Sequence, residues 1–154
     1  MTDRLIRLAT AADVGRVVDL REGMFRDMGV DCSDDAWKGP CRDWYAARID
    51  DPAHRIVVVE EAGRVVACVI GSLRDSAPVP GLAGHGDVLV STVSTDPDAR
   101  GRGHARAALE QVLAWARAAG VARAELMTSP DGRRLYEALG FRVTEFPAMR
   151  TPLV

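Results

Sequence analysis

The sequence lacks the features that mark nucleic-acid-binding, membrane and secreted proteins. Its 154 residues carry 20 basic and 22 acidic side chains, a formal net charge of -2, so no strongly basic face is available to neutralise many phosphates. No apolar run approaches the roughly 20 residues that a membrane-spanning helix needs, and the first residues lack the apolar stretch of a signal peptide. We therefore expect a cytoplasmic protein that binds neither nucleic acid nor a membrane.

Cysteine is also scarce, which bears on metal binding. Cys32, Cys41 and Cys68 form no Cys-x-x-Cys pair, and the three histidines do not stand beside them at the spacing of zinc ligands. We therefore expect no metal, and we interpret the cysteines as free or buried thiols.

What the sequence does contain is a composition and a periodicity typical of one packed domain. The chain is 47% hydrophobic and 27% charged, and no linker or internal repeat divides it. We expect a single domain over residues 1–154 in the α/β class, a mixed sheet with helices on both faces. The predicted order is β-α-α-β-β-β-α-β-α-β-β, with strands near 3–10, 55–61, 65–73, 87–95, 121–128, 141–146 and 148–154, and helices near 14–28, 34–51, 105–119 and 130–139.

A glycine-rich junction between a predicted strand and a strongly periodic helix indicates an anion site. At the N-terminus of a helix several backbone N–H groups lack partners and the helix dipole is positive. Gly101 and Gly103 remove the Cβ atoms that would hold an anion away, while Arg100 and Arg102 could add charge-assisted hydrogen bonds. The alternative is that this turn only caps a long surface helix.

Two common phosphate loops do not fit the junction. A Walker loop needs lysine and then serine or threonine after its last glycine, whereas His104 and Ala105 follow Gly103. A dinucleotide fingerprint needs a third glycine, and Arg106 stands at that position.

The sequence around this junction resembles the GNAT superfamily of acetyl-CoA-dependent N-acetyltransferases. Arg100, Gly103 and Ala105 satisfy the pattern Arg/Gln-x-x-Gly-x-Gly/Ala, and "LYEALGF" at 135–141 is similar to a segment near the family's C-terminus. The resemblance implies a GNAT-like splayed sheet and acetyl-CoA as co-substrate. It also implies that the pyrophosphate is held by the backbone of Arg100, Gly101, Arg102, Gly103, His104 and Ala105, and that the pantetheine pairs with the main chain of Val93, Ser94 and Thr95.

The resemblance assigns catalytic roles less completely. Tyr136 falls where the family often has a tyrosine that protonates the departing thiolate, and we favour this role over the alternative of a packing residue. Ser129 stands where many members have a cofactor-binding asparagine, and it could instead cap the following helix. Neither Ser91 nor Thr92 can replace the glutamate that some members use as general base, so the base is not identified. Asp87, Glu22 and His85 are candidates, but each could instead be a strand-end or surface charge, and a water relay from main-chain carbonyls would also serve.

These features predict an N-acetyltransferase that moves an acetyl group from acetyl-CoA to a primary amine by direct attack in a ternary complex. The acceptor would be a small molecule or a peptide, and the enzyme a monomer or homodimer. Arg21, Met24, Phe25 and the loop 77–86 are expected to shape the acceptor site, and a cation at Arg21 would favour an amine that also carries a carboxylate. The alternative is a non-catalytic acyl-CoA-binding sensor or partner-binding module, since the missing carboxylate removes the obvious base.

Overall fold

The computed structural model describes residues 3–154. No helix among them is long and apolar enough to cross a membrane. The regular elements run in the order β1 (Arg4–Leu8), α1 (Val14–Asp27), α2 (Lys38–Ala46), β2 (His54–Glu61), β3 (Arg64–Arg74), β4 (His85–Thr95), α3 (His104–Ala118), β5 (Val121–Leu126) and α4 (Arg133–Ala138), with short 3₁₀ turns at Ala11–Asp13 and Pro97–Ala99.

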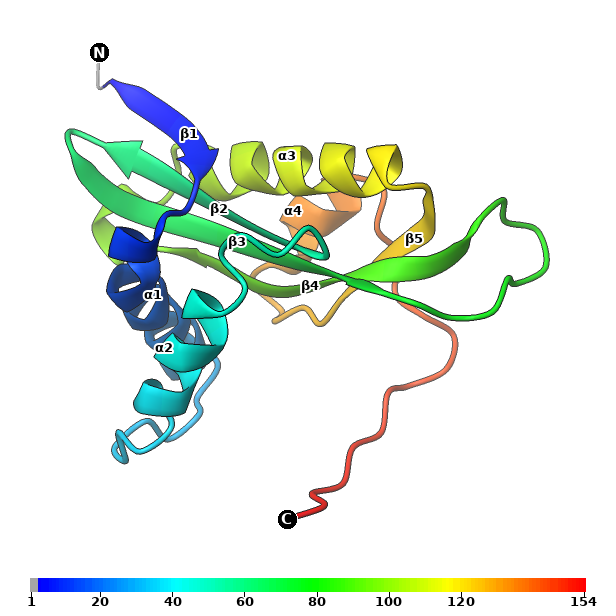
Figure 1. Cartoon of the computed structure of the whole chain (residues 1–154), viewed down its shortest axis with the longest axis horizontal. Helices are drawn as coiled ribbons and strands as arrows, with labels where there is room; N and C mark the ends of the chain where they lie inside the picture. The colour runs from blue at the N-terminus through cyan, green and yellow to red at the C-terminus, as the bar shows by residue number, and fades with distance from the viewer. Residues whose placement is uncertain (1–2) are drawn as a thin grey trace.

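The five strands form one sheet in the order β1-β2-β3-β4-β5 (Figure 1). Strands β1 to β4 pair as antiparallel neighbours, whereas β5 lies parallel to β4 because α3 carries the chain back between them. The sheet is therefore mixed, as the sequence predicts.

Both faces of the sheet are buried, because helices cover each of them. Along β2, Val57 and Val59 pack with α3, while Ile56 and Val58 point to the opposite face and pack with α1 and α2. Figure 1 shows α1 and α2 on one side of the sheet and α3 on the other. This confirms the predicted mixed α/β class with helices on both faces.

The two closing strands predicted from the sequence are not formed. Residues 141–146 and 148–154 have no regular structure and no ladder to β5, and Figure 1 shows this part of the chain leading away from the sheet. Phe146 is 79% exposed, so the apolar pattern has no face to pack against. Strand preference depends on such packing, and Pro147 and Pro152 each remove a backbone donor that a strand would need.

Candidate active site

A cavity of about 630 Å³ opens where β4 and β5 separate. The pairing of these strands ends at Val90 and Leu126, so the last residues of β4 have no neighbouring strand on this side. The end of α1, the start of α3 and α4 complete the walls. Of the predicted site residues, those that line the cavity are Val93, Ser94, Thr95, Arg100, Gly101, Gly103, His104, Ala105, Ser129 and Tyr136.

A β-bulge lies at the point where the two strands part. Thr92 pairs with Ile70 on β3. Val90 pairs with Gly71, so Ser91 between them has no partner on that strand. An extra residue of this kind bends the strand and increases its twist, which helps β4 to leave β5.

Beyond the bulge, the backbone of β4 offers hydrogen-bonding groups to the cavity. The N–H of Asp96 donates to the carbonyl of Val66 at 2.8 Å, and successive residues of an antiparallel strand direct their backbone groups to opposite edges. It follows that Val93 and Thr95 direct their N–H and C=O groups toward the open side. Ser94 directs its backbone toward β3 instead.

The start of α3 supplies unpaired donors at one end of the same cavity. Gly103 precedes the helix with φ of +76°, and Gly101 has φ of +77°, a conformation that glycine adopts without the strain other residues meet. The first helical hydrogen bond runs from the N–H of Ala107 to the carbonyl of Gly103 at 3.1 Å. The N–H groups of His104 and Ala105 therefore have no acceptor within the helix, and an anion could bind them.

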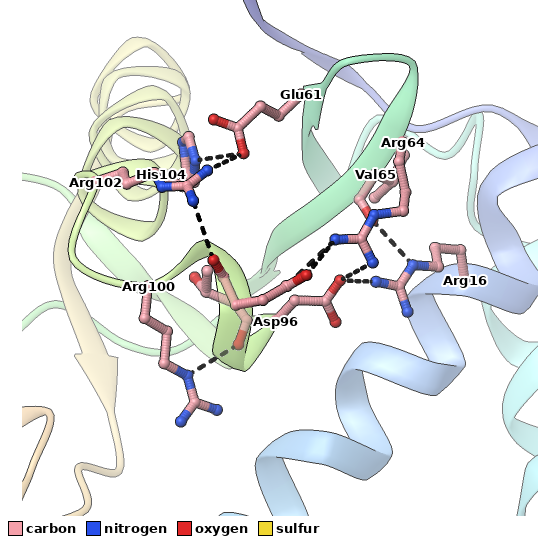
Figure 2. Close-up of polar contacts among 10 residues, drawn as sticks. Arg16, Glu61, Arg64, Val65, Asp96, Arg100, Arg102 and His104 are labelled. Carbon is pink, nitrogen blue, oxygen red and sulfur yellow. Dashed lines mark hydrogen bonds and ion pairs between the residues drawn. The ribbon is translucent and has the colours of Figure 1, made fainter. Parts of the chain in front are cut away.

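Both arginines of this loop form ion pairs with carboxylates of the chain, although Arg100 also lines the cavity. Arg100 forms an ion pair with Asp27 at the end of α1 and donates from Nε to the carbonyl of Thr95 at 3.1 Å. Arg102 pairs with Glu61 at 2.6 Å and is not among the residues that line the cavity (Figure 2). The side chains thus shape the loop, which leaves the backbone N–H groups as the donors available to an anion.

A third carboxylate, that of Asp96, anchors the start of the loop. Asp96 forms an ion pair with Arg16 of α1 and another with Arg64 of β3 (Figure 2). Arg16 also donates from Nε to the carbonyl of Val65 at 2.9 Å. These contacts join the end of β4 to α1 and β3, so the loop starts from a fixed position.

His104 has an environment that sequence reasoning missed. Its side chain is 3% exposed, and neither ring nitrogen has a hydrogen-bond partner. Nε2 lies 3.7 Å from a carboxylate oxygen of Glu61, which also binds Arg102 (Figure 2). Glu61 therefore holds two residues of the loop from the end of β2. Nothing in the sequence pattern signals this contact, because 41 residues separate Glu61 from Arg102.

Two of the predicted hydroxyl groups already have partners in the fold. The Ser94 hydroxyl donates to the carbonyl of Leu20 at 2.6 Å and so ties β4 to α1. Ser129 Oγ accepts the N–H of Gly132 at 3.3 Å, which stabilises the turn ahead of α4. The sequence predicts Ser129 as the N-cap and Pro130 as the first helical residue, whereas the α-helix itself begins at Arg133.

Tyr136 of α4 lies at the wall of the same cavity that the free end of β4 lines. Its ring packs edge-on against Phe141, with 6.0 Å between centroids, and the residue is half-buried. Burial raises the pKa of its phenol above the usual value of 10, so the hydroxyl stays protonated near neutral pH.

The two carboxylates among the candidate general bases, Asp87 and Glu22, are bound to cations. Asp87 accepts two hydrogen bonds from Arg74, both at 2.7 Å. Glu22 lies 2.5 Å from Lys38, and His85 is exposed beside the β3–β4 connection. In residues 3–154, no three His, Cys, Asp or Glu side chains gather closely enough to hold a metal ion.

The residues expected to shape the acceptor site are not all at the cavity. Met24 lines it, but Phe25 and the loop 77–86 do not. Arg21 reaches it indirectly, because its Nη1 donates to Thr92 Oγ1 at 2.5 Å and Thr92 lines the cavity.

Comparison with known proteins identifies the family. The sequence model of the Acetyltransferase (GNAT) family matches residues 17–141, so the chain belongs to this family. No curated protein sequence is a significant match. Among solved structures, a GCN5-related N-acetyltransferase from Ralstonia eutropha JMP134 is 28% identical, with a TM-score of 0.85 and 98% and 99% of the two chains covered.

Two more distant structures share the fold. An acetyltransferase from Clostridium acetobutylicum, solved with acetyl-CoA, is 20% identical with a TM-score of 0.81 over 97% of this chain and 96% of its own. An aminoglycoside N-acetyltransferase in complex with CoA is 17% identical with a TM-score of 0.79 over 100% and 97%. These likenesses confirm the predicted GNAT-like fold.

Proposed function

We propose that this acetyltransferase moves an acetyl group from acetyl-CoA to a primary amine of a small molecule or peptide, by direct attack in a ternary complex. The proposal rests on one observation: the end of β4 that has no neighbouring strand and the N-terminus of α3 with its free N–H groups line the same cavity. An extended amide-containing chain fits the first, and a pyrophosphate fits the second.

The cavity has donors suited to both parts of coenzyme A. The N–H groups at His104 and Ala105 would hold the pyrophosphate, because the left-handed glycines before them leave the backbone uncovered. Val93 and Thr95 would pair with the pantetheine amides as an added strand would. The same alternation directs the N–H of Val93, and not that of Ser94, to the side where the oxyanion of the thioester would develop.

Tyr136 would protonate the leaving thiolate. It lines the cavity, and its raised phenol pKa keeps the proton in place until an alkaline acceptor forms beside it. A packing role alone would not require the residue to reach the cavity wall.

The amine must lose its proton before it attacks. At a reference pKa of about 10, only roughly one amine in a thousand is neutral at pH 7. Asp87 and Glu22 are held by ion pairs, so we assign this step to a water relay from main-chain carbonyls of β4.

A covalent acetyl-enzyme route has less support. Cys68 is fully buried on β3, and burial raises the pKa of its thiol to about 12, so the reactive thiolate is disfavoured. Ser91 lines the cavity but hydrogen-bonds no histidine or carboxylate within residues 3–154.

The second candidate is a sensor that binds acyl-CoA without turnover, and the engaged carboxylates favour it. Incubation with acetyl-CoA and a panel of amines separates the two functions, with free thiol and acetylated amine measured together. The enzyme releases both in equal amounts. A sensor binds CoA in calorimetry but yields neither, and that result would overturn the proposal.

A further inference from the structure

The structure places one arginine beside the proposed reaction centre without a carboxylate partner. Arg21 is half-buried on α1 and forms no ion pair with any carboxylate of residues 3–154. Arg16 and Arg26 on the same helix pair with Asp96 and Glu22. A partly desolvated cation without a counter-charge is costly unless an anion compensates it.

The contacts of Arg21 fix its direction. Its Nη1 donates to Thr92 Oγ1 at 2.5 Å and to the carbonyl of Ser91 at 3.4 Å, both at the bulge of β4. The guanidinium carbon lies 4.7 Å from the centroid of the Phe25 ring, which supports its flat face. The side chain is thus held against the strand where the cavity begins.

These contacts leave one edge of the guanidinium free. Both use Nη1, so the parallel N–H groups of Nε and Nη2 make no hydrogen bond to any of residues 3–154. Neither nitrogen is among the buried atoms that lack a partner, which means that this edge reaches solvent. The Nε–Nη2 edge is the one that matches the two oxygens of a carboxylate.

We propose that Arg21 is a specificity-determining residue, and that the acceptor is an amine whose molecule also carries a carboxylate bound to its free edge. This inference rests on the proposed function, since it names the acceptor class of the same site. Ser91 and Thr92 line the cavity, so a ligand that engages Arg21 lies next to the separated end of β4.

Matched pairs of acceptors test this inference: amino acids against their carboxamides, and peptides with and without a free C-terminal carboxylate. The kcat/KM is compared within each pair after correction for the fraction of neutral amine, because the carboxylate also changes the basicity of the amine. We expect the wild type to prefer the carboxylate member by about 10-fold or more, as a charge-assisted bidentate contact gives. A ratio near one in the wild type would overturn the inference and leave the proposed function intact.

Substitutions of Arg21 test whether this residue recognises the carboxylate of the acceptor or only supports the β-bulge of β4. Arg21→Gln should bring the ratio close to one, and Arg21→Lys should keep part of it, while the KM for acetyl-CoA stays unchanged in both. Arg26→Gln, on the exposed side of the same helix, is the control and should keep the wild-type ratio. If Arg21 only held the strand, Arg21→Gln would slow both members of each pair equally, which contradicts the inference. Failure of every amine to become acetylated would overturn the proposed function, and this inference with it.

Discussion

Replacing Gly103 with glutamate tests whether the N-terminus of α3 holds the pyrophosphate. Gly103 has φ of +76°, and a Cβ at this position meets no atom within 4 Å, so the substitution strains the backbone without a clash. An L-residue in the left-handed region costs roughly 1–2 kcal/mol. In a chain of this length that lowers the melting temperature by about 2–8 °C.

The opposite end of α3 provides a matched control. Gly120 has φ of +79° and equally open surroundings, but it lies away from the cavity. Gly120→Glu therefore adds the same charge with a similar strain, and it should lower the melting temperature at least as much, because a carboxylate is unfavourable at a helix C-terminus.

The two variants should differ in cofactor binding. A carboxylate about 5 Å from one phosphate charge repels it by about 3 kcal/mol at an effective dielectric of 20. If solvent screening halves this, about 1.5 kcal/mol remains, which is a factor of about 10 in affinity. Titration calorimetry with CoA should show this loss for Gly103→Glu and none for Gly120→Glu. Affinities within two-fold of each other would refute the assignment of the pyrophosphate to this helix.

Three further predictions concern other parts of the account. Tyr136→Phe should lower kcat about 100-fold with little change in the KM for acetyl-CoA, whereas an unchanged kcat would leave the residue a packing role. Glu61→Gln should weaken CoA binding about three-fold or more, because Arg102 and His104 lose the carboxylate that holds them. The control is the exposed Glu110→Gln, which should bind CoA as the wild type does, and equal CoA affinities for the two variants would show that Glu61 does not support the loop. Arg7 holds the pKa of Asp13 below its usual value, so this carboxylate stabilises the fold above its unfolded pKa of about 3.9 and loses that contribution as the pH falls below it. Acid titration monitored by circular dichroism should therefore show a smaller loss of stability below about pH 4 in Asp13→Asn, and an identical acid transition would contradict the reasoning.

The sequence predicts the order of elements from β1 to α4 because each follows from local rules. The apolar stripe of α3 defines that helix, and Gly120 ends it as predicted. The glycine-arginine junction likewise predicts an anion site at the start of α3. Periodicity does not predict the structure after residue 141 correctly. A strand also needs a neighbouring strand and a face to pack against, and neither can be inferred from the local sequence.

The side chains of the site are less predictable than its backbone. Arg102 was expected to contribute to an anion site, but its guanidinium binds Glu61 from another element. The bulge at Ser91 and the contact of the Arg21 guanidinium with Thr92 also depend on long-range packing. In each case the partner lies far away in the sequence, so only the folded arrangement reveals the contact.

A crystal structure of the protein with coenzyme A tests the central claim most directly. We predict that the pyrophosphate lies on the backbone N–H groups of His104 and Ala105, and that the pantetheine pairs with Val93 and Thr95 and brings its sulfur toward Tyr136. The account would be contradicted if coenzyme A bound elsewhere on the protein. It would also be contradicted if the cavity between β4 and β5 remained empty at a saturating concentration of coenzyme A.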